Sequence, residues 1–473
     1  MGNPCSCIMN QSQNQASPRL LLINPWIYDF AAFDLWMKPV GLLYLAGYLR
    51  EHGYAVHLID CLDRYNPDLL KLQRVSAPGV RNYGVGNFFR RPIPKPEALK
   101  DIPHPYRRYG IPEEIFVNML QAVPHPHAIL VTSMMTYWYP AVFRTIELLK
   151  RYFPGVPVLL GGVYANLCYH HALAHSQADY VVQERDPGKI IQLIDEVSGY
   201  RSQNEFWHSR IFDTYPAYDL YEHLDYACVM TSTGCPYRCA YCASHLLNPC
   251  FVQRNPEAVF QEMRYFHTTR NIQNFAFYDD ALLVNSSQHL EPLLEQVIAD
   301  QLPCYFHTPN GLHARYITEH LAELMFQSGF KTLRLSLETT DRDRQRHTGG
   351  KVTDEEFQQA VETLKRAGFQ GKQIGVYLFV GLPGQEIRET EQTIRYVHEL
   401  GIMANLCEYS PIPGTKAWET LEQQGYVNPE DDPLIHNNSV FLYRKERHTF
   451  EQIQHIKGHV RALNRIVKAQ EAP

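Results

Sequence analysis

Length, composition and charge place the chain among ordinary folded proteins and set aside several classes. Its 473 residues are enough for two or three domains, each able to bury its own core. A hydrophobic share of 45% and a charged share of 20% are typical of globular domains. The formal net charge of −6 gives no reason to expect nucleic acid as a partner. No membrane span is expected, because the most apolar stretch, 20–37, contains Asp29 and Asp34.

Cysteine usage and the first residues indicate a reducing compartment. The eleven cysteines are an odd number and are scattered apart from one tight cluster, which favours a metal site over a disulfide framework. The N-terminus lacks the basic and apolar regions of a secretory signal. Residues 1–17, rich in Asn, Gln and Ser, are predicted to form a disordered tail. We therefore expect a cytoplasmic protein.

The pattern of residues 18–205 predicts alternating strands and helices around a long insertion at 62–125, itself expected to contain one short helix at 112–121. Such alternation predicts a doubly wound parallel sheet, whose ligands bind at the carboxyl ends of the strands. Asn24, Ser133 and the pair Gly161 and Gly162 lie at such ends. The expected strands are 20–24, 55–59, 128–132, 156–160 and 178–182, and the expected helices are 39–52, 140–152 and 187–196.

Residues 206–425 show a more regular rhythm of six strand–helix units. Six such units predict a partial (βα)6 barrel of the TIM type, with active residues on the loops after the strands. The expected strands are 227–231, 274–278, 304–307, 332–337, 373–380 and 403–408, and the expected helices are 256–266, 287–300, 317–328, 354–367 and 385–400. A C-terminal extension, 426–473, should act as a cap or packing extension with a helix at 450–469. His436 and Asn437 are expected to pack at the surface, and contact with a substrate is the alternative.

The most specific motif is the group Cys235, Cys239 and Cys242, spaced C-x₃-C-x₂-C in the loop after the first barrel strand. Three thiolates on one short loop can hold three irons of a 4Fe-4S cube and leave the fourth iron open. A structural zinc site is the alternative. Zinc takes four ligands, so it would need Cys250 or His245 as well.

The run from Thr231 to Cys242, T-S-x-G-C-P-x-x-C-x-Y-C, resembles the radical S-adenosylmethionine (SAM) enzymes. Tyr241 stands where that family usually has an aromatic residue, and Thr233 stands where it often has Arg. The resemblance implies that the open iron binds SAM through its amino and carboxylate groups. An electron from a donor such as flavodoxin or ferredoxin then cleaves SAM to a 5′-deoxyadenosyl radical.

Polar residues at the next two strand ends are candidate SAM contacts. Asp279 and Asp280 are able to bind ribose hydroxyls or the methionine ammonium, because ionised oxygens make strong hydrogen bonds, and helix capping is the alternative. Asn310 precedes Gly311, where glycine permits close backbone approach, and an ordinary Asn-Gly turn is the alternative.

Glu338 ends the fourth strand in a segment that resembles the family's S-L-E-[ST], and it is the main candidate cofactor contact besides the cysteines. Ser336 and Arg334 lie on the same face by strand alternation. A charged residue inside a barrel needs a partner, since leaving it unpaired is costly. The G-L-P-G turn at 381–384 and the P-x-P-G-T segment at 411–415 are also similar to family motifs.

The N-terminal region resembles the cobalamin-binding domain that precedes many radical SAM enzymes, through I-N-P after the first strand and the later L-G-G. Tyr164 and Gln183 depart from the usual pattern, so the sequence leaves open whether cobalamin binds. With cobalamin, methyl transfer to an unactivated carbon of a small-molecule substrate is expected. Without it, rearrangement, cyclisation or oxidation remains. A methylthiotransferase would need more cysteines than Cys61 and Cys168, and a zinc-stabilised binding module is the non-enzyme alternative.

Overall fold

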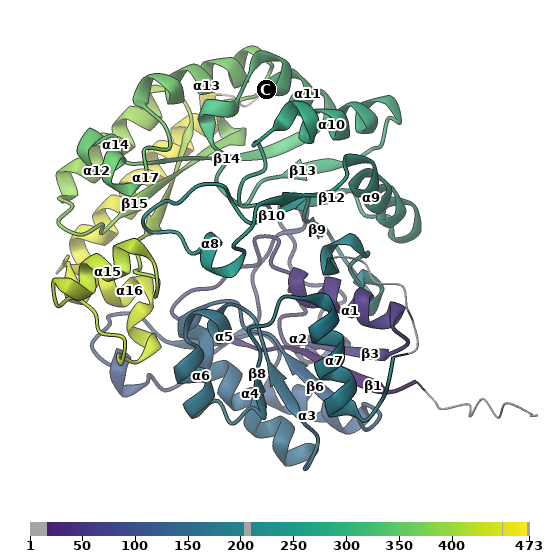
Figure 1. Ribbon diagram of the computed structural model, residues 1–473. Coiled ribbons are helices and arrows are strands. Elements are labelled where there is room, and N and C mark those ends of the chain that lie inside the picture. Colours follow the sequence, from purple (N-terminus) through teal and green to yellow (C-terminus); the bar gives the residue numbers. More distant parts are fainter. Residues whose placement is uncertain (1–16, 203–209, 447, 471–473) are drawn as a thin grey trace, which may run out of the picture.

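Two parallel sheets organise the chain, and Figure 1 shows them one above the other. The structure is a computed structural model that describes residues 17–202, 210–446 and 448–470. Residues 1–16 of the predicted tail lie outside the described part. The two sheets confirm the predicted α/β class.

The N-terminal sheet consists of five parallel strands in the order β3 (Ala55–Asp60), β1 (Arg19–Asn24), β6 (Ala128–Val131), β7 (Val158–Leu160) and β8 (Tyr180–Val181). In sequence terms this is the 2-1-3-4-5 order of flavodoxin-like folds, so the strand order reverses between β1 and β6. The continuous apolar run of β1 is buried on both faces, as expected for a central parallel strand.

Helices cover both faces of this sheet. Leu20 and Leu22 face one layer, and Leu21 and Ile23 face the other, by strand alternation. The first layer contains α1 (Val40–Glu51) and α7 (Pro187–Ser198), and the second contains α3 (Glu113–Ala122), α4 (Tyr139–Tyr152), α5 (Val163–Leu167) and α6 (Tyr169–His175). The predicted doubly wound domain is therefore confirmed.

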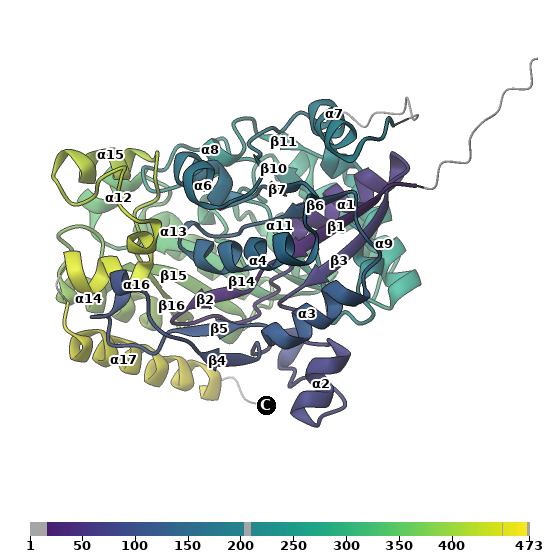
Figure 2. The same ribbon diagram turned by 90° about the horizontal axis from the view of Figure 1, so that it is seen from below.

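The insertion is more ordered than predicted. The short helix is present as α3, but a three-stranded antiparallel sheet was not expected. It consists of β2 (Ile27–Asp29), β5 (Arg107–Tyr109) and β4 (Arg90–Pro92), which lie side by side in Figure 2, and α2 (Pro67–Gln73) projects at the edge. Strands of three residues, two of them rich in Arg, carry too little alternation to be recognised in a sequence.

The second sheet is an open barrel of six parallel strands in the order β16 (Met403–Glu408), β15 (Ile374–Val380), β14 (Phe330–Glu338), β13 (Tyr305–His307), β12 (Asn274–Phe277) and β9 (Ala227–Val229). The outer helices are α9 (Pro256–Arg270), α10 (Leu290–Ala299), α11 (Glu319–Ser328), α13 (Asp354–Arg366) and α14 (Ile387–Glu399). Their apolar faces and the outward strand residues form the largest core. The predicted partial barrel is confirmed.

Segments of the N-terminal half fill the inner side of the barrel near β9. Trp36, Val40 and Tyr44 pack against the inward residues Cys228 and Ala276. The Trp36 ring also stacks on His307 at 4.5 Å between ring centroids. The two halves therefore share a buried interface.

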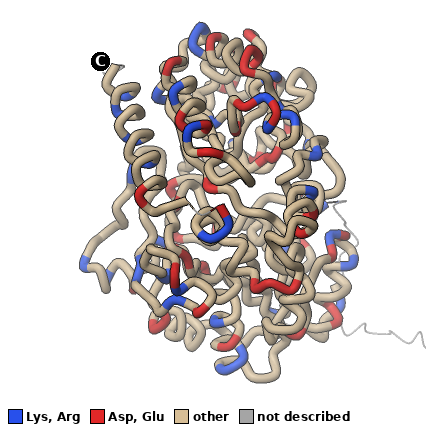
Figure 3. Tube along the Cα trace, turned by 90° about the vertical axis from the view of Figure 1, so that its left-hand side faces the viewer, with Lys and Arg blue, Asp and Glu red and all other residues tan. Residues whose placement is uncertain are grey.

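The C-terminal extension contains η9 (Pro433–His436), α16 (Asn438–Val440), η10 (Phe441–Lys445) and α17 (Phe450–Gln470). The helix α17 covers β16 and α14. In the described part of the chain no helix is both long and apolar enough to cross a membrane. Basic and acidic residues are interspersed along the trace in Figure 3.

Candidate functional site

The cysteine loop is an excursion closed at its base by a short antiparallel pair. Strand β10 (Ser232–Thr233) pairs with β11 (Val252–Gln253), and the chain between them contains α8 (Ser244–Leu247). Gly234 has a φ of 75°, and a Cβ there would overlap the backbone oxygen of Cys250. The glycine before Cys235 is thus required by both conformation and space.

Two neighbouring segments hold the centre of the loop. The backbone N–H of Ala240 donates to the Thr348 carbonyl at 3.1 Å, at the end of α12 (Arg342–Thr348). The Ala240 carbonyl accepts from the N–H of Ala417 at 2.8 Å, in α15 (Lys416–Gln423). A Cβ on Gly349 would stand 3.3 Å from the sulfur of Cys239, so this glycine lets the backbone lie close to the thiol.

The three cysteines are free, and Cys239 is buried while Cys235 and Cys242 are partly exposed. Burial raises the pKa of Cys235 and of Cys239 to about 11, so metal binding has to displace their protons. Three thiols on one loop can each bind a different iron of a cube, whereas a structural zinc takes four ligands at one point.

Glu338 lies beside this loop in a strained conformation. The pairing of β14 with β15 shifts between Ser336 and Glu338, and Glu338 has a φ of 74°. Its buried carboxylate accepts a short hydrogen bond from the Tyr241 hydroxyl and lies 3.4 Å from Lys351 Nζ. Strain of this kind is stored at functional sites more often than elsewhere. Two of the predicted site residues, Tyr241 and Glu338, are therefore in direct contact.

Lys351 is a site residue that the sequence reasoning missed. Burial lowers its pKa, but the neighbouring Glu338, Cys239 and Cys242 outweigh this and raise it, so the lysine stays charged. Its side chain also lies over the Tyr241 ring, 5.7 Å from the centroid. The signal available was the Gly349–Gly350 pair directly before it, since glycine pairs often mark a close backbone approach.

Asp279 and Asp280 differ in their surroundings. Asp279 is buried, and its carboxylate accepts hydrogen bonds from the Thr231 N–H, the Thr231 hydroxyl and the Ser232 hydroxyl. It therefore ties β12 to the base of the cysteine loop. Asp280 is exposed, and its negative charge helps to raise the pKa of Cys235. Of the pair, Asp280 has the freer carboxylate.

Asn310 and Ser336 lie on the neighbouring strand ends. The Asn310 amide donates to the carbonyls of Tyr278 and Asp279 at 2.9 and 3.2 Å, so it connects the ends of β12 and β13. Ser336 is buried on the inner face, where a Cβ on Gly311 would overlap its hydroxyl. The missing side chain at position 311 leaves Ser336 its space.

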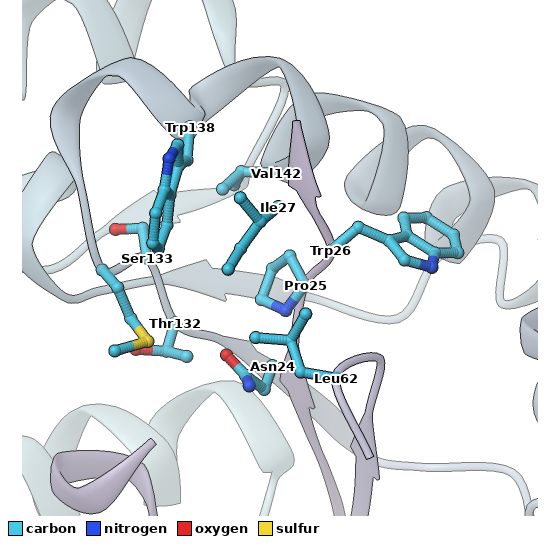
Figure 4. Close-up of a pocket in the computed structure, with 10 residues that line it drawn as sticks. Asn24, Pro25, Trp26, Ile27, Leu62, Thr132, Ser133, Trp138 and Val142 are labelled. Atoms are coloured by element: carbon cyan, nitrogen blue, oxygen red, sulfur yellow. The ribbon is translucent and has the colours of Figure 1, made fainter. Parts of the chain in front are cut away.

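A second candidate site lies where the strand order of the N-terminal sheet reverses. A cavity there is lined by residues after β1 and β6, and Figure 4 shows Trp138 and Thr132 facing Pro25 and Asn24 across it. Gly162 has a φ of 90°, and a Cβ there would stand 2.6 Å from the Ser133 nitrogen. A Cβ on Gly161 would meet nothing within 4 Å. Gly162 thus shapes the strand end, while Gly161 borders open space.

Tyr164 does not enter this cavity. Its ring is fully buried between α4 and α6, stacked on Tyr139 at 5.7 Å, and its hydroxyl lies 2.6 Å from His171 Nδ1. Gln183 donates to the Asn166 carbonyl at 3.0 Å, beside α5. The departures noted at these two positions therefore leave the cavity itself free.

The two candidate sites face each other. Helix α8 of the cysteine loop packs on α5, which follows Gly162, and the Arg185 guanidinium donates to the Leu246 carbonyl at 2.6 Å. On the other side, η9 packs on η3 (Thr136–Trp138). The expectation of surface packing for His436 and Asn437 was wrong: both are buried at this contact, because the extension folds back between the domains.

Residues 229–397 match the radical SAM superfamily. This segment of the chain is a radical SAM domain. The chain is 25% identical over 403 residues to a methyltransferase of Pyrococcus horikoshii. This match covers 80% of this chain and 78% of the relative. The chain is 20% identical over 479 residues to the cytidylyl-2-hydroxyethylphosphonate methyltransferase of Streptomyces wedmorensis. That match covers 87% of this chain and 83% of the relative.

Solved structures of radical SAM enzymes share the whole two-domain fold. The methyltransferase TsrM of Kitasatospora setae, solved with cobalamin and a 4Fe-4S cluster, has a TM-score of 0.62 at 14% identity over 86% of this chain and 78% of its own. The cobalamin-dependent enzyme OxsB has a TM-score of 0.58 at 12% identity over 89% of this chain and 63% of its own. At these identities the likeness concerns the fold alone.

The cysteine loop of this radical SAM enzyme suits the family's 4Fe-4S cluster and SAM. Three thiols on one loop match a cube with one open iron, and the adjacent Lys351 supplies a positive charge beside the thiolates. When bound, the cluster supplies the electron that cleaves SAM to a 5′-deoxyadenosyl radical. The family and the geometry together set aside the zinc alternative.

Proposed function

We propose that this enzyme methylates an unactivated carbon of a small-molecule substrate with the help of cobalamin held at the strand ends of the N-terminal sheet. The observation that carries the proposal is the packing of α8 on α5, which brings the cysteine loop to those strand ends. The methyltransferase relatives and the cobalamin-bound structural neighbour support it. Bound cobalamin would supply the methyl group.

The cavity at the reversal point is only about the size of a water molecule, so the corrin ring would lie outside it, over the open space next to Gly161. Gly161 leaves open space, Tyr164 is turned into the core, and Trp138 offers a flat apolar surface at the cavity. Ligands of doubly wound sheets bind at this position. The chain would hold the ring there through shape and backbone contacts, with Gly162 fixing the loop that carries it.

The residues of the cysteine loop and its neighbours would have separate roles. Cys235, Cys239 and Cys242 would bind the cluster, and Glu338 and Asp280 would bind polar groups of SAM. Tyr241 and Lys351 would position Glu338, because both contact its carboxylate. An external donor such as flavodoxin or ferredoxin would deliver the electron.

The nine cysteines in the described residues are all free, which supports a reducing, cytoplasmic setting.

A methylthiotransferase function has weaker support. It would need a second cluster in the N-terminal domain, where the cysteines among the described residues are Cys61 and Cys168. Cys61 is buried at the end of β3, and Cys168 is half-buried before α6. Two separate thiols do not make a cluster site.

The test is to load the anaerobic, cluster-containing protein with hydroxocobalamin, desalt it and quantify corrinoid, iron and sulfide. We expect near-stoichiometric corrinoid in the wild type. Gly161→Phe should lose it, because the ring would enter the open space, whereas Gly161→Ala should retain it because a Cβ fits. Corrinoid that washes out of the wild type while the cluster stays would overturn the cobalamin part of the proposal.

Cluster and SAM chemistry are measured in the same samples. Reduced wild-type protein should release 5′-deoxyadenosine from SAM, and replacing the three cysteines with Ala should abolish both the cluster absorption and this product. A triple variant that kept full iron and sulfide would show that the cluster lies elsewhere.

A further inference from the structure

The inner wall of the barrel carries a cationic side chain without an acidic partner. Arg334 lies on β14, on the same face as Ser336 and before the bulge that precedes Glu338. No ion pair among the described residues includes Arg334; its Nη1 donates to the Leu333 carbonyl at 3.0 Å. Burial lowers the pKa of Arg334, and Tyr377 offsets this only in part. A largely buried guanidinium whose side-chain partner is the Tyr377 hydroxyl, and no carboxylate, keeps a positive charge that an anionic ligand would neutralise.

A second unsatisfied donor lies beside it. Asn405 on β16 has a buried amide nitrogen, Nδ2, with no acceptor in the described part of the chain. A Cβ on Gly375 would overlap this nitrogen and stand 2.8 Å from Arg334 Nη1. The Arg334 guanidinium from β14 and the Asn405 amide from β16 therefore both lie against Gly375 of β15, one from each side. Any side chain at position 375 would fill the space that they border.

The chemistry of these groups selects the ligand. A guanidinium has donors only, and the free atom of Asn405 is also a donor, so besides the Tyr377 hydroxyl the described groups here offer donors and positive charge but no carboxylate. The fork of an arginine matches the two oxygens of a carboxylate or a phosphate. Arg334 and Asn405 are each partly exposed as residues.

The position relates this site to the reaction centre. Arg334 precedes Glu338 by four residues on one strand, a rise of about 13 Å. Tyr377 on β15 extends along the inner wall near Ser336, and its hydroxyl donates to the Pro309 carbonyl at 2.6 Å. Its side chain therefore lies between the level of Arg334 and the level of Glu338. Asn405 and Cys407 on β16 are partly exposed.

We propose that Arg334 and Asn405 bind a carboxylate or phosphate group of the substrate and so orient its remaining part toward the cluster. This assignment rests on the proposed function for the identity of the bound molecule as substrate. It implies that the small molecule methylated by this enzyme is an anion.

The test uses the anaerobic, cluster-loaded full chain without SAM, titrated separately with sodium phosphate and sodium acetate at constant ionic strength against chloride. The readout is the Tm. We expect a saturable rise in Tm with at least one anion, and which one acts distinguishes phosphate from carboxylate. In Arg334→Met the apparent affinity should fall about ten- to a hundredfold, as expected for losing a charged hydrogen bond.

Asn405→Asp provides a second, independent variant. The new carboxylate would pair with Arg334 inside the barrel, so this variant should lose the anion response while its Tm without anion stays equal or rises. Arg388→Met, an exposed change on α14, is the matched control and should respond like the wild type. An unchanged response in Arg334→Met and in Asn405→Asp, or no response in the wild type to either anion, would overturn the proposal.

The two proposals fail separately. Anion binding is measured without SAM or turnover, whereas the proposed function is measured by corrinoid retention and 5′-deoxyadenosine release in the wild type. A wild type that binds the anion through Arg334 but retains no corrinoid would leave the anion site standing and remove the methyl-transfer assignment.

Discussion

Glu338 combines backbone strain and charge at one residue. A non-glycine residue with a φ of 74° pays a conformational cost of about 1–2 kcal/mol. In return, the bulge turns the carboxylate toward Tyr241 and Lys351 instead of letting it continue the strand alternation. The strain is therefore tied to the placement of a charged group beside the cysteine loop.

The strain and the charge can be separated by substitution. Glu338→Gly should be more stable than Glu338→Ala by about 1 kcal/mol, because only glycine adopts this φ freely. Glu338→Gln should keep the fold but lower SAM affinity about tenfold or more, since a charged hydrogen bond becomes neutral. Urea unfolding and SAM titration are the measurements, and equal stabilities of the Gly and Ala variants would contradict the strain.

The adjacent aspartates make a matched pair for a second prediction. Asp279→Asn should lower the free energy of unfolding by about 1–3 kcal/mol, because an amide nitrogen would face the donors of Thr231 and Ser232. Asp280→Asn, at an exposed position, should change it by less than about 0.5 kcal/mol. Asp280→Asn should instead slow SAM cleavage. If Asp279→Asn were neutral in urea unfolding, Asp279 would not hold the loop.

At the scale of elements, the sequence was most informative where strands are long and buried. The apolar run at 20–24 and the six barrel strands are recognisable because short strand-like segments alternate regularly with longer helical patterns. The three-stranded sheet of β2, β5 and β4 escaped because each strand has three residues. The cysteine spacing predicted a cluster site, but contacts such as Lys351 with Glu338 depend on loops meeting in space, which no local pattern encodes.

One junction of elements is expected to respond to pH. Asp29 on β2 is buried between Trp138 Nε1, at 2.8 Å, and the Asn437 amide, at 2.9 Å, so it joins the N-terminal domain to the C-terminal extension. Burial raises the pKa of Asp29 to about 6, although these hydrogen bonds oppose the rise. The folded protein then binds the proton more tightly than the unfolded chain.

The sign follows from proton linkage. Because the folded pKa exceeds the unfolded value of about 3.9, the stabilisation by this group is complete below pH 4 and is lost as the pH rises through 6. The free energy of unfolding of the wild type relative to Asp29→Asn should fall by up to about 3 kcal/mol between pH 4 and pH 7. Urea unfolding at several pH values measures it, and a constant difference would contradict the raised pKa.

At the scale of the whole molecule, a buried polar network joins the two domains to the cysteine loop. The Tyr44 hydroxyl of α1 donates to Glu262 of α9 at 2.9 Å, and the Arg254 guanidinium pairs with Glu262 at 2.6 Å. Arg254 also donates to the carbonyl of Met230 from its side chain and to that of Thr231 from its backbone. One ion pair thus connects the sheet domain, the barrel wall and the base of the loop.

Breaking one side of this pair should cost more than removing both. Glu262→Met alone should destabilise the protein by about 3–5 kcal/mol, because it leaves the Arg254 charge buried without a partner. Arg254→Met should have a similar effect, and the double variant should cost less than the sum of the two. The measurement is urea unfolding followed by tryptophan fluorescence and by cluster absorption. Because Arg254 anchors the loop base, its variant should lose the cluster absorption at lower urea than the wild type. Additive effects in the double variant would mean that Arg254 and Glu262 do not stabilise each other.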